Sequence, residues 1–322
     1  MEISARTARQ WARLGPRGVF GQAVLSIAEN CPDLMVMSAD LGSSSGLERF
    51  RQSYPDRFLN TGIAEQNLIG VAGGMAKEGY NVFATSFSPF IAMRASDQVR
   101  MNLGYMQLNV KAVAIGSGIG MGFLGNSHFG IEDAAVMRSI PNMTVVCPAD
   151  CSEIVKTVQA AANFTGPMYI RLTGAPNMAA VYNDDYDFEF GKAITLREGK
   201  DVGIIACGAM VGQSMKAADM LAENGIEATV LNMHTIKPLD KAALSKLATT
   251  VPRIVTVEEH SVIGGLGSAV AEYFAPHGQR PAHKLIGIQD KYIKTGEYGY
   301  MLEQEKLDAT SLCETISAFL ES

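Results

Sequence analysis

Short apolar runs alternate with longer amphipathic stretches along most of this chain. In the first half, the runs expected to form buried strands are 34–37, 81–85, 110–116, 144–147 and 168–172. Helices are expected between them over 65–78, 92–103, 132–139 and 151–163. Asp150 and Glu153 have the spacing of a capping box at the start of the last of these helices. The alternation predicts an α/β fold whose mostly parallel sheet has helices on both faces.

A polar, aspartate-rich stretch over 175–190 interrupts this alternation. A second series follows, with strands expected over 202–206, 228–231, 254–258 and 284–287 and helices over 213–223, 240–248, 267–274 and 311–320. The sequence therefore predicts two doubly wound α/β domains, 1–178 and 191–322, joined by a linker at 179–190.

Composition excludes several classes of function. The chain has 322 residues, is 47% hydrophobic and has a net charge of −6, and its Lys and Arg residues are scattered. Nucleic acid is therefore not an expected partner. No run approaches the roughly 18 apolar residues of a membrane span, so no membrane association and a cytoplasmic location are expected. The five cysteines lack zinc-site spacing, so they are expected to be reduced and no metal ligands are predicted.

Polar and aromatic residues follow the first three expected strands. A polar turn at 38–45 follows the first strand, and Phe87 and Phe90 follow the second. The third leads into a glycine-rich stretch at 116–130 that contains His128. Ligands of open α/β sheets bind at the carboxyl ends of the strands, so we expect these residues to meet at one edge.

Glu65 follows a short turn and opens a helix rich in glycine and alanine. A carboxylate held there, near Phe87 and Phe90, is suited to binding a protonatable heterocycle. The alternatives are a helix-start glutamate that stabilises the helix dipole and aromatic residues that belong to the ordinary core.

Residues 34–173 resemble the pyrimidine-binding domain of transketolase-type thiamine diphosphate enzymes. The similarity rests on GIAEQN at 62–67, the aromatic pair with RASDQVR at 94–100, and His128 followed by IPNM at 140–143. Residues 191–322 resemble the carboxy-terminal domain of that family. There the matching runs are NMHTIKPLD at 232–240, VEEH at 257–260 and GGLG at 264–267.

The resemblance implies which residues bind the cofactor. Glu65 matches the carboxylate that bonds the pyrimidine nitrogen N1′, and Phe90 and Phe87 match the aromatic residues that flank the ring, Phe90 more directly. Asp40 and Leu41 match a loop near the thiazolium, and Ile63 lies in the GIAEQN motif. A plain turn aspartate is the alternative for Asp40.

The resemblance also implies substrate contacts. His128 matches a histidine that contacts the donor hydroxyls and transfers a proton at the carbonyl. Arg17 corresponds to an arginine that holds a sugar phosphate, although its stretch aligns poorly, and Ser43 lies in the turn after the first strand. Arg94 is a candidate anion ligand at the mouth, with a solvated helix arginine as the alternative.

The diphosphate-binding half of such an enzyme has no counterpart in the sequence. A GDG run followed by asparagine about thirty residues later, which anchors Mg²⁺ and the diphosphate in the family, is absent. The resemblance therefore implies the carboxy-terminal subunit of a split transketolase, inactive alone. Its expected partner is the amino-terminal subunit, which would supply the Mg²⁺ ligands in a heterodimer or α2β2 tetramer.

Two departures from the family pattern concern the substrate, a sugar or sugar phosphate. Leu124 stands where transketolases have an acidic residue that binds a donor hydroxyl, and Gly174 stands where an arginine commonly binds the acceptor phosphate. Arg171 is nearby, but at the end of a strand it should point to another face. The sequence therefore predicts transfer of a two-carbon ketol unit from a ketose to an aldose on a non-standard sugar.

Three alternatives stay open at this point. A 2-oxo acid dehydrogenase β subunit shares the GIAEQ run and the two-domain layout, and a deoxyxylulose-phosphate-synthase-like condensation is another. RASDQVR together with IPNM favours transketolase over the dehydrogenase, and the synthase-like reaction ranks third. A non-catalytic scaffold subunit is disfavoured because such a protein has no need to retain Glu65 beside an aromatic pair.

Overall fold

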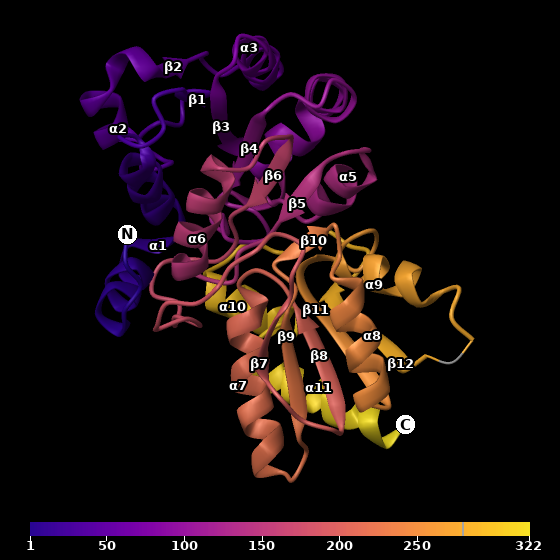
Figure 1. Cartoon of the computed structure of the whole chain (residues 1–322). Helices are drawn as coiled ribbons and strands as arrows, with labels where there is room; N and C mark the ends of the chain where they lie inside the picture. The colour runs from indigo at the N-terminus through magenta and orange to yellow at the C-terminus, as the bar shows by residue number, and fades with distance from the viewer. Residues whose placement is uncertain (279) are drawn as a thin grey trace.

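The computed structural model describes residues 1–278 and 280–322. The chain forms two β-sheets, which lie one above the other in Figure 1. The first sheet has seven strands in the order β10-β5-β6-β4-β3-β1-β2, and the second has five in the order β12-β11-β8-β9-β7. Neighbouring strands are parallel except at two edges, where β10 pairs with β5 and β7 pairs with β9. The predicted α/β class with mostly parallel sheets is confirmed.

The first half of the chain supplies six strands of the first sheet. These strands are β1 (Leu34–Ser38), β2 (Phe58–Asn60), β3 (Asn81–Phe87), β4 (Val110–Ile115), β5 (Thr144–Val146) and β6 (Met168–Arg171). The helices are α1 (Ala5–Ile27), α2 (Glu48–Ser53), α3 (Glu65–Lys77), α4 (Ser96–Gln98), α5 (Asp133–Ser139) and α6 (Cys151–Ala162), with 3₁₀ turns at Pro55–Arg57 and Gly125–Ser127. All five predicted strands are present, whereas β2, α1 and α2 were not predicted. Gly15, with φ +81°, and Pro16 interrupt the α1 periodicity.

The capping box expected at α6 is only half present. The Asp150 side chain accepts the Glu153 N–H at 2.8 Å, as predicted. The Glu153 carboxylate, however, accepts the N–H of Ala149 at 2.6 Å instead of that of Asp150. The cap residue therefore fixes the start of the helix, while the buried glutamate anchors the chain one residue earlier.

The helix predicted over 92–103 has an unusual geometry. It consists of a π-helix over Phe90–Arg94, the short α4, and a second π-helix over Val99–Tyr105. The Ala95 N–H donates to the Phe90 carbonyl five residues earlier at 3.1 Å. Such wide turns are rare and frequently occur at functional sites. Apolar spacing alone does not distinguish them from α-helix.

The second half of the chain forms the second sheet, its helices and one strand, β10, that belongs to the first sheet. The strands are β7 (Ile194–Arg197), β8 (Val202–Ala206), β9 (Ala228–Asn232), β10 (Thr235–Lys237), β11 (Arg253–Ser261) and β12 (Ala282–Ile288). The helices are α7 (Met210–Glu223), α8 (Lys241–Thr250), α9 (Leu266–Phe274), α10 (Tyr298–Gln304) and α11 (Ala309–Glu321). Every predicted element is present, but β7, β10 and α10 were not predicted. These are short, and β7 is only half-buried at a sheet edge.

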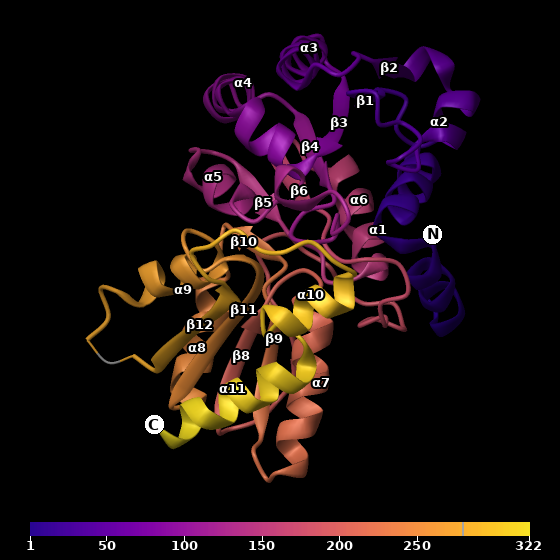
Figure 2. The same cartoon turned by 180° about the vertical axis from the view of Figure 1, so that it is seen from behind.

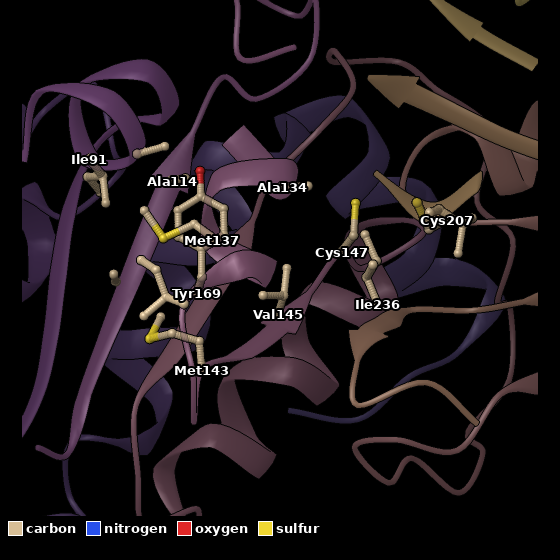
Figure 3. Packing of buried hydrophobic residues seen from close by; sticks show 14 of the residues in the cluster. Ile91, Ala114, Ala134, Met137, Met143, Val145, Cys147, Tyr169, Cys207 and Ile236 are labelled. Carbon is tan, nitrogen blue, oxygen red and sulfur yellow. The ribbon is translucent and has the colours of Figure 1, made fainter. Parts of the chain in front are cut away.

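The strand β10 joins the two halves of the molecule. It belongs to the second half by sequence but pairs with β5 as the edge of the first sheet, as Figure 1 shows at the junction. One apolar cluster continues across this junction, and Figure 3 shows Val145 and Cys147 beside Ile236 and Cys207. The carboxyl ends of strands from both sheets therefore face each other. Among the described residues, no helix combines the length and apolar character that crossing a bilayer requires.

Candidate active site

The carboxyl ends of β1, β3 and β4 meet at one edge of the first sheet. In that sheet β1 pairs with β3, and β3 pairs with β4, all in parallel. The loops after them therefore converge, together with the turn from β2 into α3. The residues that the sequence analysis selected on these loops come within reach of one another.

Glu65 is the first residue of α3, and only 2% of it is exposed. Its Oε2 accepts a hydrogen bond from Arg94 Nη1 at 2.7 Å. Its Oε1 accepts one from Ser86 Oγ, at the end of β3, at 3.4 Å. The carboxylate is thus held in one place by a side chain at the end of β3 and by one on the π-helix that follows it.

The Arg94 guanidinium lies between this carboxylate and an aromatic ring. Its Cζ is 4.1 Å from the centroid of the Phe90 ring, and its side chain is 47% exposed. The π-helix over Phe90–Arg94 places the two residues on one side. Glu65 and Phe90 therefore hold a flat cation by hydrogen bonding at its edge and stacking on its face.

His128 contacts both aromatic residues of the pair. Its ring is 5.2 Å from that of Phe87 and 5.1 Å from that of Phe90, in edge-on arrangements. Ser127 Oγ is 3.0 Å from its Nδ1. Burial, and then the nearby Arg94 charge, lower the pKa of His128 below its ordinary value. The imidazole is therefore neutral at physiological pH and can accept a proton.

Asp40 and Ile63 lie on two turns, one after β1 and one after β2, and Asn60 links these turns by hydrogen bonds. Asp40 has φ +58°, a conformation that aspartate tolerates better than most residues. Asn60 Oδ1 accepts the N–H groups of Asp40 and Gly62 at 2.9 and 3.0 Å, and its Nδ2 donates to the Asp40 carboxylate at 3.0 Å. Sequence reasoning missed Asn60, although it closely precedes the GIAEQN motif.

The remaining predicted residues contribute less directly. The Leu41 N–H donates to Ser38 Oγ at 2.9 Å, which closes the turn after β1. The Ser43 carbonyl accepts the Gly46 N–H at 3.0 Å, and the Arg17 carbonyl packs against the same glycine. Between described residues, no hydrogen bond or ion pair joins Arg17 or Ser43 to the group around Glu65.

A buried ion pair behind the aromatic residues was not predicted. Arg171 Nε donates to both Asp133 oxygens at 2.9 Å. Ser88 Oγ and Tyr169 OH donate to Asp133 Oδ2 at 2.6 and 2.8 Å. Burial alone would raise the pKa of Asp133, but the charges of Arg171 and His260 and the hydrogen bonds from Ser88 and Tyr169 together outweigh it and hold that pKa below its ordinary value. The Arg171 side chain is buried and held by Asp133.

The chain matches two protein-family models that together span most of its length. Residues 14–175 match the transketolase pyrimidine-binding domain, and residues 191–311 match the transketolase C-terminal domain. The chain belongs to the transketolase family. This family is thiamine diphosphate-dependent and consists of transferases.

Similar proteins are separately encoded parts of transketolases. A putative transketolase C-terminal section from Methanocaldococcus jannaschii is 40% identical over 94% of this chain and 95% of its own length. One of the subunits of the apulose-4-phosphate transketolase of Phocaeicola vulgatus is 36% identical over 95% of this chain and 97% of its own. A solved split-gene transketolase, an inactive β4 tetramer, is 39% identical, with a TM-score of 0.86 over 95% of this chain and 98% of that chain. This transketolase chain is accordingly a subunit of the split type, which acts with a partner subunit.

Proposed function

We propose that this chain provides the aminopyrimidine half of a thiamine diphosphate site. In the assembled enzyme, that site would transfer a two-carbon ketol unit from a ketose to an aldose. The observation that carries the proposal is the flat Arg94 cation held between Glu65 and Phe90. A protonated aminopyrimidine is also a flat cation with N–H donors at its edge. The residues present therefore fit the cofactor of the family.

Cofactor binding requires Arg94 to leave this position. The Arg94 side chain is nearly half exposed, whereas the Glu65 carboxylate that it pairs with is buried. Loss of Arg94 alone would leave that buried charge without a partner, but a protonated aminopyrimidine in the same place would restore both the charge and the hydrogen bond. Once displaced, Arg94 would lie at the mouth of the site, where it could bind an anionic group of the substrate.

Each residue then has a defined task. Bound thiamine diphosphate supplies an electron sink for the two-carbon unit. Glu65 holds a proton at N1′ of the pyrimidine, and Phe90 supports the ring, with Phe87 behind it. His128, whose lowered pKa favours the neutral imidazole, accepts or returns a proton at the substrate oxygen. Asp40, with Leu41 and Ile63, shapes the wall nearest the thiazolium.

The partner subunit is proposed to cover the mouth of the site. Large apolar side chains are exposed on the surrounding turns and on the π-helical segment: Ile63, Met93, Met101, Tyr105 and Met106. Ile63 and Tyr105 are 77% and 75% exposed, which is unusual for isolated side chains of this size and typical of an interface. The partner would bring the diphosphate-binding loop and the Mg²⁺ ligands, in an α2β2 assembly in the cytoplasm.

The substrate is proposed to be a non-standard sugar, as the name of the Phocaeicola vulgatus relative indicates for that protein. Leu124, which cannot bind a hydroxyl, lies on the loop four residues before His128. Gly174, which follows β6, has no side chain that could bind a phosphate group in place of the arginine common in the family. Steady-state rates with xylulose 5-phosphate and ribose 5-phosphate test this proposal. Rates comparable to those of an ordinary transketolase would contradict it. Carbon dioxide release from pyruvate would indicate a reaction of the dehydrogenase or synthase type in place of ketol transfer.

The role of Glu65 is tested by Glu65→Gln in the complex with the partner subunit and cofactor. The matched control is Glu78→Gln, which makes the same change at the exposed far end of α3. We expect Glu65→Gln to melt like the control but to lose nearly all turnover, because glutamine cannot relay a proton to N1′. Titration calorimetry with thiamine diphosphate shows whether binding weakens as well. Turnover close to that of Glu78→Gln would overturn the assignment.

A further inference from the structure

The glycine-rich loop that contains His128 extends away from its own sheet toward the second one. Its two ends are closed by reciprocal backbone hydrogen bonds between Gly118 and Gly130, at 2.8 and 2.9 Å. Residues between them reach the chain that precedes α10, and Figure 2 shows that yellow segment running along the junction with the first domain. The position of His128 therefore depends on what holds this loop from outside.

Glu259, on β11 of the second sheet, holds the beginning of the loop. It is almost completely buried. Its Oε1 accepts the Ile119 N–H at 2.7 Å, and its Oε2 accepts Tyr298 OH at 2.6 Å. A Cβ atom at Gly118 would lie only 2.2 Å from Oε1. The carboxylate is thus packed directly against the loop backbone and is tied to α10 by its other oxygen.

Asn126 holds the end of the loop, two residues before His128. Its Nδ2 donates to the Ile293 carbonyl at 2.9 Å, and its Oδ1 accepts the Ile293 N–H at 3.2 Å. Between these two anchors, Gly122 lies against the Gly296 carbonyl, where a Cβ would approach to 2.2 Å. The second domain therefore contacts the loop at its start, middle and end.

The burial of the Glu259 carboxylate lowers the stability of the folded chain. Burial raises the pKa of Glu259 to about 7, because a carboxylate loses its hydration there and the opposing hydrogen bonds compensate only in part. An apolar residue of similar size would avoid this cost. A buried acid at this position, bonded to the backbone of the loop, is therefore better explained by the geometry it imposes than by its contribution to folding.

We propose that Glu259 and Asn126 are positioning residues through which the second domain fixes His128 over the aromatic pair. The proposal rests on the function proposed above for His128. Neither residue contacts that histidine directly; both act through the loop backbone. Catalytic groups lose about a hundredfold in rate when displaced by 1 Å, so a loop held at two points controls turnover without contacting substrate.

The test uses Asn126→Ala, Glu259→Ala and Glu259→Gln in the full-length chain. Asn126 lies on the surface of the loop, so its variant should fold even if Glu259→Ala does not. Asn224→Ala is the matched control, because among the described residues that side-chain amide bonds only within its own helix end, to the Met220 carbonyl. Glu259→Gln is the conservative variant: its carbonyl can still accept from Ile119, and its amide can donate to Tyr298.

Amide hydrogen exchange over residues 117–130 is the first measurement and needs no partner or cofactor. We expect faster exchange there in Asn126→Ala and Glu259→Ala, with little change in Glu259→Gln and none in Asn224→Ala. The second measurement is kinetics in the assembled enzyme. Both alanine variants should lower kcat/KM for the ketose donor by about ten- to a hundredfold, while the affinity for thiamine diphosphate is retained.

Two results would overturn the proposal. One is unchanged exchange over 117–130 in both alanine variants, which would show that these contacts do not hold the loop. The other is faster exchange with wild-type kcat/KM, which would show that the position of the loop does not matter for turnover. Failure of the proposed function has a different signature: Glu65→Gln then turns over normally, whatever the exchange shows.

Discussion

The buried Arg171–Asp133 pair makes a sharp prediction for Arg171→Met. Methionine approximates the length of arginine, so the change removes the charge and donors with little loss of volume. In the wild type, Arg171 donates to both Asp133 oxygens and, through Nη2, to the carbonyls of Gly130 and Glu259 at 2.7 and 2.8 Å. The variant leaves the buried Asp133 carboxylate with hydrogen bonds from Ser88 and Tyr169 and with His260 Nε2 3.9 Å away, and it leaves two carbonyls without this donor.

The size of the effect follows from these contacts. Removal of one partner from a buried ion pair typically costs about 3 to 5 kcal/mol. Each buried carbonyl that loses its donor adds about 1 kcal/mol or more, but such terms are not additive in one network. We therefore expect a loss of about 4 kcal/mol in the free energy of unfolding. At about 2 to 4 °C per kcal/mol for chains of this size class, the melting temperature should fall by about 8 to 16 °C.

Thermal unfolding of the full-length chain, followed by circular dichroism at pH 7, measures this shift. The double variant Arg171→Met with Asp133→Asn provides the control, because it removes the unpaired charge and should recover about 1 to 3 kcal/mol relative to Arg171→Met. Since the folded pKa of Asp133 lies below its ordinary value of 3.8, its stabilising contribution is present above that pH and is lost as the pH falls further.

Two outcomes would refute this reasoning. A melting temperature for Arg171→Met within about 2 °C of wild type would mean that the pair contributes nothing net. A double variant that is no more stable than Arg171→Met would mean that the unpaired Asp133 charge is not the source of the loss.

Two further predictions concern packing and pH. Gly21→Ala in α1 would bring a Cβ to 1.9 Å from the Gly46 carbonyl oxygen, so it should destabilise the chain by about 1 to 3 kcal/mol in thermal melts. The control is Gly70→Ala on α3, where a Cβ would meet nothing within 4 Å, so this variant should be neutral or stabilise the chain by up to about 1 kcal/mol. Equal melting temperatures for the two variants would contradict the packing argument. Burial raises the pKa of Glu153 from 4.5 to about 7, so wild-type stability should fall by up to about 3 kcal/mol as the pH rises between those values. Glu153→Gln should make the stability measured by urea denaturation fall less steeply over that range, while the pKa of Glu259, also raised to about 7, keeps part of the slope. Parallel curves for variant and wild type would show that Glu153 is not a source of the slope.

Much of the fold could be predicted because strand position is a local property. Apolar runs at 34–37, 81–85 and 110–116 correspond to β1, β3 and β4, and their parallel order brings the predicted loops to one edge. The missed elements have weak local signals. The strands β2 and β10 are three residues long, and α1 is interrupted at Gly15.

The candidate site could be predicted in part for the same reason. Phe87, Phe90 and His128 follow neighbouring strands, and the structure brings their ring centroids to between 5.1 and 5.9 Å of each other. Their catalytic roles, with that of Glu65, stay predictions until the variants are measured. Arg17 and Ser43 were selected by alignment of a weakly matching stretch and by position in a turn, and neither is bound to this group among the described residues.

The sequence by itself determined the alternation of strands and helices, the transketolase motifs and the place of Glu65 at the start of a helix, because each depends on residues close together in the chain. Only the tertiary structure decided which distant groups meet. It placed Arg94 on Glu65 across 29 residues, Arg171 on Asp133 across 38, and Ile119 on Glu259 across 140. The first two contacts join elements packed around the first sheet, and the third joins the two sheets. Each depends on how distant segments pack together, so no local pattern of residues specifies it.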